Sequence, residues 1–149
     1  MHPEDLTKKL KTTEETNTFL AAVDAFSHSL YTTSPKGVEA FFPLDIAELL
    51  KKGNSGGDWL GYLNALKLYL LSIKPVKITL ATDPDGLLID NIYDWALQLF
   101  GDPVILDISY DPIILGGAVI AYGGLYYDGS LLAALNTRLT RFKSEVVKV

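Results

Sequence analysis

The sequence contains no cysteine, which excludes disulfide bridges, thiolate metal sites and a cysteine nucleophile. It has only two histidines, His2 and His28, and neither stands in a cluster of possible ligands, so we expect no metal site. A hydrolase triad built on Asp128 and Ser130 would have to recruit one of these histidines from a distant part of the chain. We therefore expect Asp128 and Ser130 to cap a helix, and we predict no catalytic residues and no enzymatic activity.

Long basic stretches and long apolar stretches are also missing. With a net charge of −5 and lysines that cluster only in short pairs, the chain is not expected to bind nucleic acid. The longest uncharged stretch, residues 112–127, is shorter than the roughly 20 apolar residues of a membrane-spanning helix, and glycine pairs interrupt it twice. Residues 1–5 are polar and acidic, unlike a secretory signal. Any association with a membrane is expected to be indirect.

Phosphate-binding and calcium-binding loops are not recognisable either. The glycine pairs at 116–117 and 123–124 belong to no G-x-G-x-x-G pattern, and no Walker lysine accompanies them. Residues 83–86 have the paired carboxylates of a calcium loop, but an aspartate in a predicted helix, Asp94, stands where an EF-hand has its twelfth-position glutamate. We interpret residues 83–86 as a turn and helix cap, and we expect no cofactor and no small-molecule ligand.

The first half of the chain predicts helices. In a chain of 149 residues that is 48% hydrophobic, one domain or two small ones can bury a core. Apolar residues up to position 74 recur at the three- and four-residue steps of amphipathic helices, and segments 34–37 and 53–57, rich in proline or glycine, interrupt them. We predict an N-terminal helical domain over residues 1–74, a short bundle of three or four helices.

The second half alternates strands and helices. Residues 76–80 and 104–108 predict strands, and a helix between them is indicated by a stripe of Leu88, Ile92, Trp95 and Leu99. A hairpin over residues 117–127 and a final helix that begins at Ser130 follow, with a stripe of Leu131, Leu135, Leu139 and Phe142. We predict a C-terminal α+β domain over residues 75–149, a small four-stranded sheet with two helices, so that the whole chain is α+β.

A spaced motif near the C-terminus resembles a known family. An apolar residue and a glycine pair are followed after five residues by a further glycine, and after four more by an Asp-Gly-Ser triplet that opens the last helix. This pattern resembles the delta subunit of rotary F-type ATP synthases, the family of the oligomycin-sensitivity-conferring protein. Gly129 is expected to have a positive φ or to cap the bend between strand and helix. The motif residues are Leu115, Gly116, Gly117, Gly123, Asp128, Gly129 and Ser130.

The resemblance implies a mechanical role rather than a chemical one. A delta subunit is a stator: it ties the alpha subunits of the catalytic head to the b-type helices of the membrane-anchored peripheral stalk. It is a peripheral membrane protein on the cytoplasmic face, held there by the synthase complex. The family's N-terminal domain has six helices over about a hundred residues, so the resemblance implies a reduced bundle in this chain.

The last helix is the expected place of contact with the stalk. The family meets the b-type helix through this domain, and an apolar side chain left over on the last helix would face that partner; Leu132 and Asn136 are the candidates. Family members commonly have a basic residue where this chain has Ala121 or Leu132, which implies a more apolar surface here or a different partner sequence. The alternative is that the leucine stripe of this helix packs on its own sheet.

Two other functions remain open from the sequence. Trp95, Tyr122, Tyr126 and Tyr127 would line a ligand cage in a small binding or enzymatic α+β domain, although packing in the core or on the sheet explains aromatic residues in strands more simply. An adaptor that has kept the α+β module outside the synthase is the other alternative.

Overall fold

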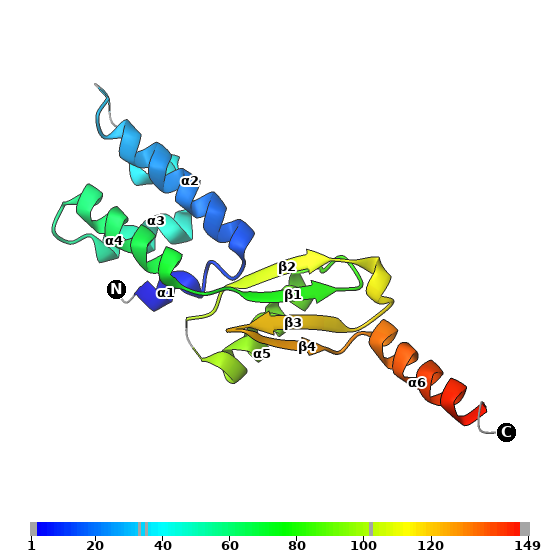
Figure 1. Cartoon of the computed structure of the whole chain (residues 1–149). Coiled ribbons are helices and arrows are strands. Elements are labelled where there is room, and N and C mark those ends of the chain that lie inside the picture. Colours follow the sequence, from blue (N-terminus) through cyan, green and yellow to red (C-terminus); the bar gives the residue numbers. More distant parts are fainter. Residues whose placement is uncertain (1–2, 33, 35, 102, 147–149) are drawn as a thin grey trace.

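The computed structural model describes residues 3–32, 34, 36–101 and 103–146. Four helices come first, a mixed four-stranded sheet with one inserted helix follows, and a last helix ends the chain (Figure 1). The predicted α+β class, with helices before a four-stranded sheet and two further helices, is confirmed. In order, the elements are α1 Pro3–Thr7, α2 Thr13–Ser29, η1 Val38–Ala40, α3 Leu44–Gly53, α4 Trp59–Ser72, β1 Val76–Leu80, α5 Gly86–Phe100, β2 Leu106–Tyr110, η2 Pro112–Ile114, β3 Ala118–Tyr122, β4 Leu125–Asp128 and α6 Leu131–Val146.

The N-terminal helices enclose their own apolar core. A capping box starts α2: the Thr12 hydroxyl accepts from the Glu15 amide, and the Glu15 carboxylate accepts from the Thr12 amide. Further along α2, the Phe26 ring meets Phe41 and Trp59, with ring centroids 5.5 and 5.4 Å away. The spacing that predicted amphipathic helices therefore corresponds to a buried cluster shared by these helices.

The sheet has the strand order β2-β1-β3-β4. Strands β1 and β2 are parallel, so they need the crossover that α5 supplies, whereas β1–β3 and β3–β4 are antiparallel. In register, Ile78 of β1 lies opposite Ile108 on one side and Ile120 on the other. These side chains pack against the core beneath α5, which covers one face of the sheet (Figure 1).

Helix α5 forms where it was predicted, but a different face packs on the sheet. The buried residues of α5 are Tyr93 and Ala96, each one position beyond Ile92 and Trp95 of the predicted stripe. Trp95 and Leu99 are 41% and 60% exposed, and Leu88 is exposed as well. The stripe that indicated the helix therefore lies only partly on the face that packs, since Ile92 contacts the core while Leu88, Trp95 and Leu99 are exposed. The physical reason is that α5 is apolar on two adjoining faces, so periodicity alone does not identify the face that packs.

A buried joint connects the N-terminal helices to the sheet. The segment between α1 and α2 runs beside β2, where the Leu106 amide donates to the Lys11 carbonyl oxygen at 2.8 Å. The Lys11 ammonium group bonds Asp90 of α5 at 2.6 Å and lies over the Tyr93 ring. The Tyr93 hydroxyl donates to the Thr7 carbonyl oxygen at 3.2 Å. The boundary at residues 74/75 stays a prediction, and the two parts that it separates are joined by these contacts.

The Tyr93→Phe variant is predicted to lower the free energy of unfolding by about 1 kcal/mol, the usual net contribution of one buried hydrogen bond. It removes the donor to the Thr7 carbonyl oxygen and leaves the ring, which is buried, in place. Urea unfolding of the variant measures this loss. Tyr31→Phe, at an exposed tyrosine, is the matched control and should leave stability unchanged. Equal stability of Tyr93→Phe and the wild type would contradict the role of this bond.

Helix α6 does not pack along the sheet. It contacts η2 near its beginning and then leads away from the other elements (Figure 1). The interpretation that its leucine stripe packs on its own sheet is therefore wrong for Leu131, Leu135 and Leu139, which are all exposed. The side chain of Phe142, the fourth member of that stripe, lies outside the described part of the chain.

Candidate partner-binding site

The base of α6 is built by two segments that cross: the entry to β3 and the bend after β4. The Leu131 amide donates to the Gly116 carbonyl oxygen at 2.8 Å, and the Gly129 amide donates to the Ala118 carbonyl oxygen at 3.0 Å. Leu115, just before the glycine pair, has a φ of 65°, which is unusual for a residue with a side chain. The motif residues at the two ends of the β3–β4 hairpin thus meet where α6 starts.

Gly117 permits this crossing. Its φ of 76° lies in the left-handed region, and a Cβ added there would lie 2.3 Å from the Gly129 carbonyl oxygen. A side chain at this position would therefore meet backbone, which does not move aside as a flexible side chain does. Both the backbone conformation and the space require glycine.

Of the two alternatives predicted for Gly129, the positive φ is not observed, whereas its position at the bend between strand and helix is. The positive φ values in this region belong to Gly117 and to the hairpin residues Gly123 and Gly124, at 58° and 85°. The hairpin pair needs them because a two-residue turn that matches the strand twist has positive φ at both positions. Gly129 occupies the bend itself, between the end of β4 at Asp128 and the start of α6 at Leu131, and a Cβ there would lie 3.0 Å from the Tyr127 ring. No continuous helix runs through this bend.

Asp128 and Ser130 satisfy backbone amides at the first turn of α6. The buried Ser130 hydroxyl accepts from the Ala133 amide at 3.1 Å. The Ser130 amide donates to the Asp128 carboxylate at 2.9 Å. These bonds are typical of a capped helix start, and they orient α6 relative to β4.

The pKa of Asp128 is lowered from its ordinary value by the hydrogen bond to the Ser130 side chain and then by that to the Ser130 amide. Because the pKa is lower in the folded state, this interaction stabilises the fold above the unfolded-state pKa of about 3.9, and the stabilisation is lost as the pH falls through the folded-state pKa. Asp128→Asn should therefore be less stable than the wild type at neutral pH, and the difference should close in acid. Urea unfolding across this range measures it, and a difference that does not change with pH would contradict the assignment.

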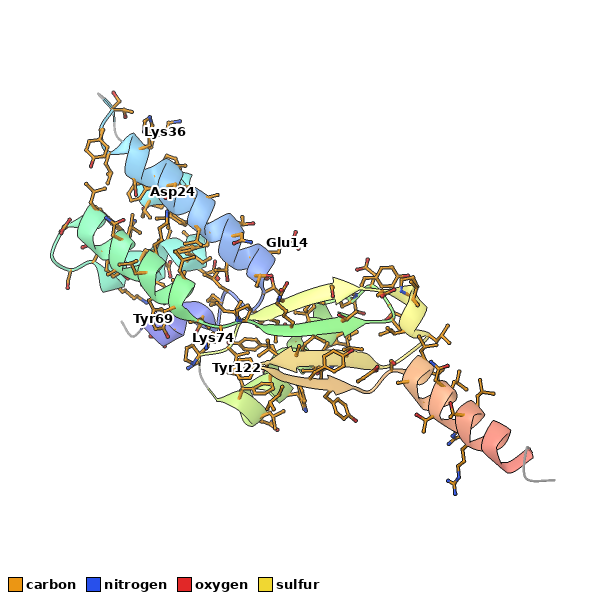
Figure 2. All side chains as sticks on the ribbon, viewed as in Figure 1. Glu14, Asp24, Lys36, Tyr69, Lys74 and Tyr122 are labelled. Carbon is orange, nitrogen blue, oxygen red and sulfur yellow. The ribbon has the colours of Figure 1, made fainter. Side chains whose placement is uncertain are left out.

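The surface of α6 carries an unpartnered row of leucines. Leu131, Leu135 and Leu139, which we call the α6 leucine stripe, are 49%, 40% and 56% exposed. Of the two residues predicted from the sequence, Asn136 is exposed, whereas Leu132 is half-buried and lies beside the stripe. Among the described residues, no other element lies alongside the outer turns of α6 (Figure 2). The contact predicted at Leu132 and Asn136 remains a prediction, and the stripe offers more exposed apolar area next to it.

A second apolar surface lies between α5 and the β3–β4 hairpin. We call it the α5–β4 groove; it has a volume of about 320 Å³ and an almost wholly apolar lining. The four aromatic residues considered as a ligand cage all line it, and Tyr122 stands on the hairpin side (Figure 2). Tyr126 and Tyr127 are exposed, so they do not belong to the core. The lining residues are Trp95, Leu99, Phe100, Ile120, Tyr122, Leu125, Tyr126 and Tyr127.

The described residues contain neither a cluster of three or more metal-ligating side chains nor a helix long and apolar enough to cross a membrane. The two surfaces are exposed and apolar, and contiguous exposed apolar area is typical of sites that bind protein segments.

The chain is similar to two curated proteins, both named ATP synthase subunit delta. The protein from Anaeromyxobacter sp. (strain Fw109-5) is 42% identical over 59 residues, which are 40% of this chain and 33% of that protein. The protein from Desulfatibacillum aliphaticivorans is 34% identical over 79 residues, which are 52% of this chain and 43% of that protein. The chain thus matches less than half the length of either relative, and no family model matches it.

Proposed function

We propose that this chain is a peripheral-stalk subunit of a rotary F-type ATP synthase, which links the catalytic head to the b-type stalk helices and has no chemistry of its own. The observation that carries the proposal is the exposed leucine stripe on a helix that leads away from the fold, in a chain similar to two delta subunits. An amphipathic partner helix would bury this stripe against its own apolar face. Through the complex, the chain would be a peripheral membrane protein on the cytoplasmic face.

The architecture supports a role in which the chain bears load. A stator must hold two partners at a fixed relative position while the rotor turns, so its two binding regions need a stiff connection. The joint between the N-terminal helices and the sheet, with its backbone bond from Leu106 to Lys11 and its buried Tyr93–Thr7 bond, supplies one. The exposed leucines Leu68 and Leu71 on α4 are candidates for contact with the alpha subunits of the head.

Reconstitution of the synthase in proteoliposomes with and without this chain tests the proposal. Without a stator, the head should turn with the rotor, so ATP hydrolysis should persist while ATP-driven proton pumping is lost. Adding the chain back should restore pumping. Pumping of equal efficiency with and without the chain would refute the proposed function.

The purified chain is predicted neither to bind nor to hydrolyse ATP. The glycine pairs of this chain form a strand entry and a hairpin turn rather than a loop that cradles phosphates at a helix N-terminus. Isothermal titration with ATP and a phosphate-release assay check this prediction. The same titration with ADP checks that the chain does not bind the diphosphate either. Specific binding at micromolar concentration would contradict the assignment of a purely mechanical role.

A further inference from the structure

The α6 leucine stripe and the α5–β4 groove are two apolar surfaces that no other element covers in the part of the chain that the structure describes. Leu99 at the edge of the groove is 60% exposed, and Leu125 and Tyr127 on the hairpin side are exposed as well. The stripe is a convex row of three leucines on a helix, and the groove is concave and lined almost wholly by apolar side chains. The two shapes are of the kind that fit each other, as an amphipathic helix fits a groove.

The stripe does not reach the groove of its own chain. Helix α6 begins beside Asp128, at one end of β4, whereas the groove extends to the other end of that strand, at Tyr122 and Leu125 beside the hairpin turn. From its start α6 leads away from the sheet (Figure 1). To fold back, it would have to break the bond from the Leu131 amide to the Gly116 carbonyl oxygen.

The two surfaces also lie in parts of the chain with opposite net charge. Residues 76–128, which span the sheet and α5, contain eight aspartates, one lysine (Lys77 of β1) and no arginine or glutamate. Helix α6, residues 131–146, contains three basic residues and one acidic residue, all from Arg138 onward. The groove therefore belongs to a strongly acidic module, and the outer turns of α6 belong to a basic one. Opposite charges of this kind favour an encounter between the α6 of one copy and the groove of another.

We propose that two copies of this chain associate, with α6 of each copy lying in the α5–β4 groove of the other. The arrangement is two-fold and reciprocal, so one pair of complementary surfaces makes two identical contacts. It buries both unpartnered surfaces at once and brings each basic helix onto an acidic module. The dimer is a state of the free chain and does not depend on the proposed function. Because the stalk helix would bury the same stripe, the dimer and the stalk complex exclude each other.

Sedimentation velocity over a concentration series tests the dimer. We expect a monomer–dimer equilibrium that weakens as salt is added, because the charge complementarity is screened. Leu139→Asp on the stripe and Leu99→Asp in the groove should each raise the dissociation constant about tenfold or more, since each places a charge in an apolar contact. Leu44→Asp, at a similarly exposed leucine at the start of α3, should leave it unchanged. Circular dichroism checks that each variant folds.

A mixture of the groove variant Leu99→Asp and the stripe variant Leu139→Asp tests the reciprocal arrangement most directly. A pair made of one Leu99→Asp copy and one Leu139→Asp copy has one intact contact, whereas each variant alone forms no pair with an intact contact. The mixture should therefore associate more strongly than either variant. Because the chain has no cysteine, Leu99→Cys and Leu139→Cys copies should also form a disulfide-linked heterodimer on mild oxidation, without disturbance by other thiols. The proposal would be overturned if the wild-type chain were monomeric at all concentrations. It would also be overturned if the control substitution raised the dissociation constant as much as the two variants do, or if the mixture showed neither added association nor cross-linking.

Discussion

Replacing Gly117 with alanine is expected to lower the free energy of unfolding by about 2–4 kcal/mol, a large loss for one methyl group. Two effects add. The φ of 76° is strained for any residue with a side chain, and the new Cβ would lie 2.3 Å from the Gly129 carbonyl oxygen. Since that oxygen is backbone, relief requires the segment at the base of α6 to shift. Urea unfolding, with far-ultraviolet circular dichroism to follow the helices, measures the loss.

Two other glycines separate the contributions. Gly123 has a φ of 58° but nothing within 4 Å of an added Cβ, so Gly123→Ala should show the backbone strain alone, about 1 kcal/mol or slightly more. Gly86 has neither a positive φ nor a close neighbour, so Gly86→Ala should be neutral or slightly stabilising in α5. Equal losses at Gly117 and Gly123 would show that the crossing of the two segments is not tight.

Gly129→Val should also destabilise, by about 1–3 kcal/mol, and for a reason other than φ. The added side chain would crowd the Tyr127 ring and the Ala118 carbonyl oxygen, which lie 3.0 and 3.2 Å from an added Cβ. Tyr127 is exposed and can move, whereas the carbonyl group is held in the sheet. The expected loss is therefore smaller than at Gly117, and an unchanged thermal midpoint would contradict it.

A charge on the leucine face of α6 is expected to weaken binding to the b-type stalk helix by about 1.5–3 kcal/mol. Leu135→Asp is the cleaner variant, because Leu135 is exposed and its loss should spare the fold. Leu132→Asp should weaken binding as well, but Leu132 is half-buried, so its substitution also removes contacts within the chain. Isothermal titration with the stalk segment measures the affinity.

Thr137→Asp is the matched control for these variants. Thr137 is exposed on the same helix but points away from the leucine stripe by helical periodicity, so the charge should leave the affinity unchanged. Binding that is unaffected by Leu135→Asp and Leu132→Asp would move the interface elsewhere. An unfolded Leu132→Asp protein would make Leu132 a core residue and remove it from the candidate interface.

The order of elements was predictable because local patterns determine it. Alternating residues mark β1, the Asp85 side chain caps α5 by accepting from the Leu88 amide, and paired glycines make the hairpin at Gly123. These signals act over a few residues, so the sequence alone carries them. The α+β class follows from their order.

The errors concern contacts between distant parts of the chain. The face of α5 that packs depends on where β1 and β3 place their side chains, and the residue spacing within α5 contains no information about those strands. Gly117, rather than Gly129, has the positive φ because its segment crosses the segment of Gly129, which lies twelve residues further along the chain. In the same way, the sequence left open whether the leucines of α6 pack on their own sheet or meet a partner, because a helix whose partner is another molecule has the same periodicity as one that packs in its own fold.

The most direct test of the proposed function is a titration of this chain with the C-terminal half of the b-type subunit from the same synthase. We expect saturable binding of one chain to one stalk, and we expect its loss when the chain is truncated after Asp128 so that α6 is removed. The circular dichroism of the truncated chain should retain the signal of the remaining elements. Saturable binding that requires α6 supports a stator. The absence of binding by the folded, full chain would contradict the proposal.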